Sequence, residues 1–253
     1  MKCFSKFLTA LTMIAGAAMA HPLKIYTEIS IPQQIQGPDG RLSGIGVDTV
    51  REIQKRIGNT DPIQLVPWAR GYREVTMDPD VLLFSMGRTA ERNPLFHWVG
   101  PVDELGFFIF VKADSAITIK SLKDAQKLKA IGVYQNDVRD LFLTKAGFTN
   151  LDRVNDQVTN VKKLMIGHLD AIVSSETGVA DLAKSAGYRV SDLKPAFGFY
   201  NIQLYLAFSR ATPAATVEAW SNALEAMKRD RTFERIYRTY EPKRALPGPA
   251  VTP

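Results

Sequence analysis

Arg92 is the residue best suited to bind a ligand, because it follows the apolar run 81–84 together with Ser85 and Gly87. Such a run predicts a strand buried on both faces, and open α/β sheets bind ligands where their strands end. A guanidinium donates two parallel hydrogen bonds to a carboxylate, and a hydroxyl and free backbone N–H groups can bind the same anion. The cluster predicts a carboxylate site, although Glu91 could hold Arg92 in a surface salt bridge and Ser85 could form a turn.

Further candidates follow two other predicted strands in the first half of the chain. Glu28 comes after strand 23–27, and Trp68 and Arg70 come after strand 63–66. An indole in this place could stack on a ligand, and Arg70 could bind a second anionic group. The alternative for Trp68 is packing between a helix and the sheet.

The second half of the chain adds polar residues after strands 130–134 and 170–173, namely Gln135, Asn136, Asp137, Ser175 and Glu176. The first three precede a predicted helix, whose N-terminus would offer free N–H groups to an anion. Asp137 could equally be a plain N-cap of that helix. Glu176 could face the same site or cap the helix that follows.

Recognisable catalytic and metal-binding motifs are absent from the sequence. The three histidines, His21, His97 and His168, lack ligand spacing, and the single cysteine is Cys3. There is no P-loop, no G-x-G-x-x-G and no G-x-S-x-G, and Ser174-Ser175 has no adjacent histidine. We expect no metal, no cofactor and no enzyme activity. A formal charge of +6 without a basic block also argues against nucleic acid as a partner.

The elements that must position these residues alternate between strands and helices. Predicted strands are 23–27, 63–66, 81–84, 107–111, 130–134, 170–173 and 204–208, and predicted helices are 47–57, 121–128, 138–146, 161–166, 217–227 and 233–237. Alternation of this kind predicts an α/β fold with mostly parallel sheets. Apart from the N-terminus, only 247–253 is expected to be disordered.

The N-terminus has the pattern of a secretory signal peptide. Lys2 and Lys6 precede the uncharged apolar run 7–19, and Ala18-Met19-Ala20 is an A-x-A cleavage site. A transmembrane anchor is the alternative, but the run is shorter than the roughly 18 to 20 residues that a span needs. We expect cleavage after Ala20 and an exported protein that suits a bacterial periplasm.

Five short motifs occur in a characteristic order: Asp39-Gly40-Arg41-Leu42-Ser43-Gly44 with Val47-Asp48, then Arg88-Thr89-Ala90-Glu91-Arg92 with Phe96, Trp98 and Gly100-Pro101, then Ile131-Gly132-Val133-Tyr134-Gln135, then Gly167-His168-Leu169-Asp170-Ala171, and finally 226–240. In this order, behind a signal peptide, they resemble the periplasmic solute-binding proteins of family 3, the polar amino-acid type that serves ABC importers. The resemblance covers nearly all of 23–241.

The resemblance implies the type 2 periplasmic-binding-protein fold. It has two α/β lobes, each a mostly parallel sheet flanked by helices, with two hinge crossings near 108–111 and 199–202. The implied divisions are a signal peptide at 1–20, lobe 1 at 21–107 and 202–241, lobe 2 with the hinge strands at 108–201, and a C-terminal tail at 242–253. The lobes are expected to close on the ligand, and a membrane partner to recognise the closed form.

The resemblance also assigns roles to the candidates. Arg92 matches the arginine that grips the ligand's α-carboxylate. The aspartate that usually pairs with the ligand's ammonium is replaced by Ser175, and the usual aromatic residue after the first strand is missing from 31–34. Either Glu28 and Glu176 take over the ammonium, or the ligand is not a standard α-amino acid.

The resulting expectation is a monomeric periplasmic protein that captures a small carboxylate-bearing solute and delivers it to the permease of an ABC importer. Three alternatives stay open. The protein could report to a sensory receptor, since its pocket would look the same. It could be a dehydratase of prephenate-like acids on the same fold, with Glu28 or Glu176 as general acid. It could also be a partner-binding module with a degraded pocket.

Overall fold

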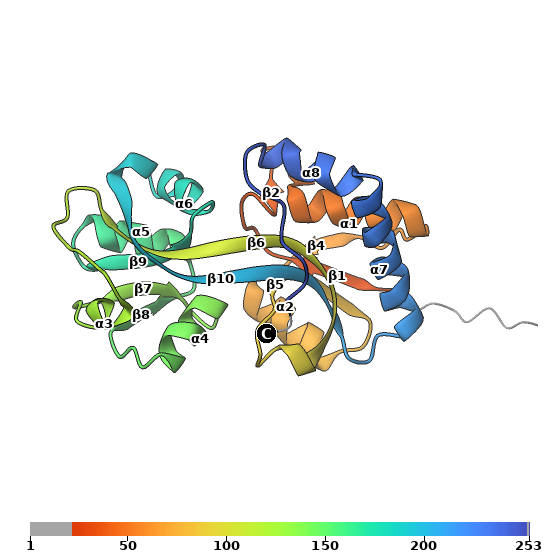
Figure 1. The fold of residues 1–253 in the computed structure, drawn as a ribbon, viewed down its shortest axis with the longest axis horizontal. Helices are drawn as coiled ribbons and strands as arrows, with labels where there is room; N and C mark the ends of the chain where they lie inside the picture. Colours follow the sequence, from red (N-terminus) through yellow and green to blue (C-terminus); the bar gives the residue numbers. More distant parts are fainter. Residues whose placement is uncertain (1–21, 252) are drawn as a thin grey trace, which may run out of the picture.

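Two antiparallel strands of 17 residues each, β6 (Phe96–Lys112) and β10 (Leu193–Ser209), run through both lobes of the molecule (Figure 1). The computed structural model describes residues 22–251 and 253. All the longer strands lie in one eight-stranded sheet of order β4-β1-β5-β10-β6-β9-β7-β8. The paired strands β6 and β10 therefore form the middle of the sheet, and each lobe adds three strands to one side of the pair.

The first lobe adds three parallel strands covered by helices on both faces. Its elements are β1 (Lys24–Thr27), β4 (Ile63–Leu65), β5 (Val81–Gly87), α1 (Ile45–Ile57), α2 (Trp68–Met77), α7 (Ala214–Arg229), α8 (Thr232–Tyr240) and the small sheet of β2 (Ile35–Gln36) and β3 (Leu42–Ser43). Leu82 and Phe84 pack in the core that contains α1 and α7, whereas Val81 and Leu83 pack in the core that contains α2. The apolar run of β5 follows from burial on both faces.

The second lobe repeats this arrangement on the other side of β6. It contains the parallel strands β7 (Ile131–Tyr134), β8 (Leu151–Val154) and β9 (Ala171–Ser175) and the helices α3 (Leu122–Ala125), α4 (Val138–Lys145), α5 (Gln157–Met165) and α6 (Val179–Ser185). Val133 packs in the core that includes Leu143 of α4, and Ile172 packs with Val161 of α5. Short 3₁₀ turns at Asn93–Leu95 and Val190–Asp192 precede β6 and β10.

The predicted α/β fold with two lobes is confirmed, but the two lobes share one sheet, which is mixed rather than mostly parallel in each of them. Each parallel trio meets an antiparallel member of the β6–β10 pair, since β5 pairs antiparallel with β10 and β9 with β6. The seven predicted strands are present, but β8 was not predicted, because Asp152 and Arg153 interrupt its apolar pattern. Gly58 ends α1 in the left-handed conformation, with φ 70°, which glycine adopts without strain.

The C-terminal tail differs from the expectation of disorder. Its described part, 242–251, lies against the long strands, and backbone groups of Gly248, Pro249 and Val251 bond to the Gln203 side chain of β10. The predicted signal peptide, 1–20, lies outside the described residues. Within the described ranges no helix combines the length and the apolar composition that crossing a membrane requires.

Close packing of β7 against α5 gives a test of the second lobe. A Cβ on Gly132 would lie 2.5 Å from the Asn160 Oδ1 atom and 2.6 Å from the Leu169 Cδ1 atom. We expect Gly132→Ala to lower the free energy of unfolding by about 1–3 kcal/mol, the usual cost of overpacking. Urea denaturation followed by circular dichroism measures it, with the exposed Thr149→Ala as control. Equal stability of the two variants would contradict this packing.

Candidate functional site

A cleft of about 360 Å³ lies where the parallel strands of both lobes end. Residues just after or at the ends of β1, β5, β7, β8 and β9 all line it, as expected for open α/β sheets. Seven of the predicted site residues are among the lining: Glu28, Trp68, Ser85, Gly87, Arg92, Asp137 and Ser175. Four lie outside it: Arg70, Gln135, Asn136 and Glu176.

Arg70 points away from the cleft because of its place on α2. Residues two apart on a helix are separated by about 200°, so Trp68 and Arg70 face opposite ways. The Arg70 guanidinium is bound by Glu74, with Nε 2.8 Å from Oε1, on the helix surface. This contact raises the pKa of Arg70. The cleft therefore receives the indole of α2 and not its guanidinium.

The other three residues outside the lining are exposed. Gln135 and Asn136 form the turn between β7 and α4, and Asn136 takes a left-handed φ of 62° while its N–H donates to Asp140. Glu176 follows Ser175 at the end of β9, and it lines a second cavity beside the C-terminal tail. Alternation along an extended chain directs these two neighbours to opposite sides.

Arg92 is a buried cation without an acidic partner in the part of the chain that the structure describes. Its guanidinium packs against two neighbouring rings, with the guanidinium carbon 5.2 Å from the ring centres of both Trp68 and Tyr72. The residue is only 4% exposed, and its Nη1 donates to the Gly87 carbonyl at 3.3 Å. Burial lowers the pKa of Arg92. Cation–π contacts offset only part of the desolvation of a charge, so this arrangement favours an incoming anion.

The backbone at the end of β5 places Ser85 and Gly87 in the cleft lining together with Arg92. Ser85 has a left-handed φ of 60°, which costs a residue with a side chain of the order of 1–3 kcal/mol. Its hydroxyl accepts a hydrogen bond of 2.5 Å from the Gln34 amide. A Cβ on Gly87 would lie 2.4 Å from the Ile202 Cδ1 atom, so glycine allows the close approach of β10.

The N-terminus of α4 is occupied by a side chain of the protein itself. The Asp137 carboxylate accepts from the N–H groups of Arg139 and Asp140 at 2.8 and 3.1 Å, as an N-cap does. The Arg139 guanidinium pairs with the same carboxylate, donates to Gln157 at 3.0 Å and lies 5.3 Å above the Phe107 ring. These contacts leave the helix end with fewer free N–H groups for a ligand and add a second buried arginine to the cleft.

Glu28 connects the two lobes at the cleft. The Tyr134 hydroxyl at the end of β7 donates to its Oε2 atom at 3.4 Å. Burial raises the pKa of Glu28 to about 7, and the charge of Asp137 adds to the rise while Arg139 opposes it. The same burial and the negative charge of Glu28 raise the pKa of Tyr134. Glu28 is therefore a carboxyl group whose charge can change near neutral pH.

Two serine hydroxyl groups lie at the end of β9, which lines the cleft. The Ser175 hydroxyl accepts from the Gly178 N–H at 3.0 Å, just before α6 begins. The Ser174 hydroxyl is buried and has no partner among the described residues. This strand end can therefore donate or accept hydrogen bonds but carries no charge.

Several lining residues were not predicted from the sequence, among them Tyr134, Arg139, Asn155, Asp156 and Gln157. Three of these follow β8, so recognising that strand would have placed them at the cleft. Arg139 lies two residues beyond the predicted Asp137, and its pairing back to the cap could not be read from spacing. Within 22–251, no group of three acidic, histidine or cysteine side chains could hold a metal ion.

The Glu28 carboxyl group should make stability depend on pH. In the folded protein it keeps its proton up to about pH 7, whereas an unfolded chain releases it near about 4.3. Between these values the folded state binds more protons, so the free energy of unfolding falls as pH rises. We expect Glu28→Gln to melt at a higher temperature than the wild type at pH 8, and at the same temperature at pH 4. Thermal denaturation measures this, with Glu176→Gln as control, and parallel melting curves across this range would contradict it.

The chain is similar to known proteins in both sequence and fold. Residues 23–243 match the family described as bacterial extracellular solute-binding proteins, family 3. A probable histidine-binding protein of Neisseria gonorrhoeae is 23% identical over 89% of this chain and 86% of its own. The L-cystine-binding protein TcyJ of Escherichia coli is 23% identical over 81% of this chain and 76% of its own.

Solved structures share the fold at lower identity. A histidine kinase sensor domain similar to periplasmic binding proteins has a TM-score of 0.79 at 15% identity, covering 87% of this chain and 95% of its own. The arginine-, lysine-, histidine-binding protein ArtJ of Geobacillus stearothermophilus has a TM-score of 0.76 at 17% identity, covering 89% and 97%. Since the family match spans most of the sequence, the chain belongs to the bacterial extracellular solute-binding proteins of family 3.

Proposed function

We propose that the cleft binds an amino acid or a close relative through its carboxylate. The observation that carries this proposal is Arg92, a buried guanidinium with no acidic partner in 22–251, at the end of a strand in the cleft. A ligand carboxylate would accept two hydrogen bonds from its planar fork. Ser85 and the backbone near Gly87 would add neutral hydrogen bonds to the same group.

The ammonium group of such a ligand would bind Glu28. Ser175 is uncharged, Glu176 lies outside the cleft lining, and the Asp137 carboxylate already accepts from two N–H groups and Arg139. Two further carboxylates line the cleft: Asp156 caps α5, and Asp181 lies on α6. Among the described side chains, Tyr134 makes the one hydrogen bond to Glu28, and that contact is long. An arriving cation would favour the ionised form of its carboxyl group. Trp68 would contribute apolar contact area beside the carboxylate.

The proposed biological role is capture and delivery. Lobe 1, at 21–107 and 202–241, and lobe 2, at 108–201, would close on the ligand about the middle of β6 and β10. The closed monomer would then dock on the permease of an ABC importer. Relatives named for binding histidine, cystine or arginine support a small amino-acid ligand. The similarity to a histidine kinase sensor domain supports the alternative that the partner is a receptor.

One observation favours a second candidate function. Glu28 is a cleft carboxyl group with a pKa of about 7, which is what a general acid at neutral pH requires. A structural relative at 20% identity is described as an amino-acid-binding precursor of cyclohexadienyl dehydratase. Incubation of the purified protein with prephenate, followed by absorbance, tests for dehydration, and Glu28→Gln should abolish any turnover.

The carboxylate site predicts the effect of one substitution. We expect Arg92→Ala to abolish binding of whichever of L-arginine, L-histidine, L-cystine and L-glutamine the wild type binds in a calorimetric screen, because the neutral side chain cannot hold a carboxylate. The matched control is Arg70→Ala, which removes an exposed arginine from α2 outside the cleft lining and should leave affinity unchanged. Wild-type affinity in Arg92→Ala, with a normal melting transition, would remove this site from the proposal.

Export to the periplasm predicts a defined N-terminus. When the full chain is produced in a Gram-negative host, we expect the protein recovered by osmotic shock to begin at His21, because signal peptidase cleaves after Ala-x-Ala. N-terminal sequencing measures this. A mature chain that begins at Met1, or one that stays with the membrane, would contradict export as a cleaved protein.

A further inference from the structure

The end of the C-terminal tail, 248–251, and the ligand cleft lie on opposite faces of the same two strands. Leu105 and Phe107 of β6 and Leu204 of β10 line the cleft, and Leu105 also borders the cavity beside the tail. Their neighbours Glu104 and Gln203 bond to the tail instead. Because side chains alternate along a strand, this division places the tail behind the cleft, across the middle of the β6–β10 pair.

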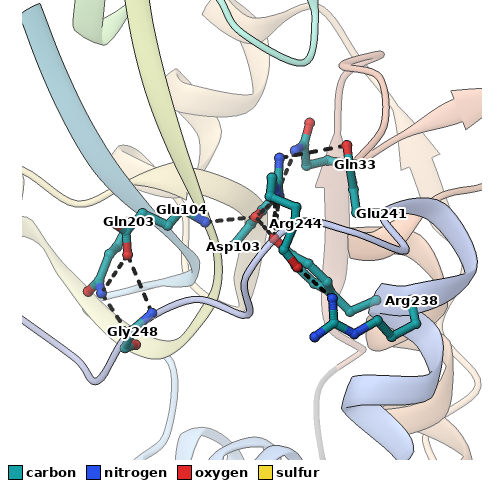
Figure 2. Close-up of polar contacts among 9 residues, drawn as sticks. Gln33, Asp103, Glu104, Gln203, Arg238, Glu241, Arg244 and Gly248 are labelled. Carbon is teal, nitrogen blue, oxygen red and sulfur yellow. Dashed lines mark hydrogen bonds and ion pairs between the residues drawn. The ribbon is translucent and has the colours of Figure 1, made fainter.

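One end of the tail is anchored by a buried charge cluster in the first lobe (Figure 2). Arg244 forms an ion pair with Asp103 of β6, which is 1% exposed. Asp103 also accepts from the Tyr237 hydroxyl at 2.9 Å and from the Gln33 amide at 2.5 Å. The Arg238 guanidinium of α8 donates to the Arg244 carbonyl at 2.6 Å. These contacts fix the point at which the tail leaves the first lobe.

The other end of the described tail is held by Gln203 of β10. Its amide donates to the Pro249 carbonyl at 2.9 Å and to the Gly248 carbonyl at 3.4 Å, and its oxygen accepts from the Val251 N–H at 3.0 Å (Figure 2 shows the contacts to Gly248). The Tyr205 hydroxyl donates to the same oxygen at 2.9 Å. A proline-rich segment that cannot form a helix is thus held by side-chain hydrogen bonds.

A cavity of about 440 Å³ separates the tail from the second lobe. On one side it is lined by the tail residues Ala245 and Leu246, and on the other by Glu176 and Thr177, which follow β9. Gly106 of β6 forms part of its floor. The tail is therefore anchored to the first lobe and faces the second lobe across a gap on the back of the hinge.

We propose that the tail is a stop that limits how far the lobes open. When two lobes open on one face of a hinge, their walls approach each other on the opposite face. Opening the ligand cleft would thus close the gap between the tail and the loop at Glu176 until the two make contact. The inference rests on the hinge motion of the proposed function but not on the identity of the ligand.

Two variants release the stop in different ways. Deletion of 246–253 keeps the Arg244 anchor and removes the part of the tail that Gln203 holds. Gln203→Ala keeps the whole tail and removes the side chain that binds it. Lys243→Ala, an exposed residue of the tail with no side-chain partner in the described ranges, is the matched control.

Spin-label distances between the lobes measure the opening. Arg73→Cys in α2 and Leu141→Cys in α4 place exposed labels on the helices whose first turns line the cleft, and the only other cysteine, Cys3, lies in the predicted signal peptide. Without ligand, we expect both release variants to gain a population at longer distance that the wild type and Lys243→Ala lack. Their radius of gyration in solution scattering should increase as well.

Each outcome decides the inference. Distance distributions identical to the wild type in both release variants would overturn it, whereas a longer population in either variant, with an unchanged melting transition, supports it. Amino-acid binding is measured on the same samples by calorimetry. Distance distributions that do not change in the release variants, together with amino-acid binding by the wild type, would mean that this inference fails while the proposed function stands. A longer population in the release variants, without amino-acid binding by the wild type, would mean the reverse.

Discussion

The antiparallel pairing of β6 and β10 is the constraint on which the rest of the structure depends. Strands of 17 residues extend about 56 Å, whereas the usual strand has five or six residues, so one ladder serves both lobes. Each lobe adds its parallel trio to one end of the pair, and all six trio strands end toward the middle. The cleft results from this arrangement, because the strand ends of both lobes meet at the middle of the β6–β10 ladder, where no further strand pairs with it.

The electrostatics of the cleft follow from the burial of its charged side chains away from water. Arg139 is balanced by Asp137, so Arg92 is the positive charge left without a partner in the described chain, and Glu28 stays mostly neutral below pH 7. Arg92 therefore favours an anion at its own end of the cleft. Asp156 and Asp181 also line the cleft and add negative charge to it. In the proposed binding mode, ionisation of Glu28 suits a zwitterion, whose two ends would meet Arg92 and Glu28.

The fold and part of the cleft could be predicted from the sequence for a physical reason. Apolar runs such as 81–84 report burial on both faces, and polar residues at their ends report the edge where ligands bind, which placed Arg92 and Ser85 correctly at the cleft. Side-chain direction could not be derived in the same way. Arg70 and Glu176 have the right chemistry and the right strand ends, but a helical turn and an extended-chain alternation point them elsewhere.

The tail illustrates why local composition alone is insufficient. Residues 247–251 are rich in proline and glycine and form no regular element, yet a single side chain of β10 satisfies three of their backbone groups. Gln203 can do so because its neighbour Leu204 faces the cleft, so the same two strands carry a ligand site on one side and a chain segment on the other. A shift of either strand by one residue would exchange these faces. The register of the β6–β10 ladder thus decides both which side chains line the cleft and which side chains bind the tail behind the hinge.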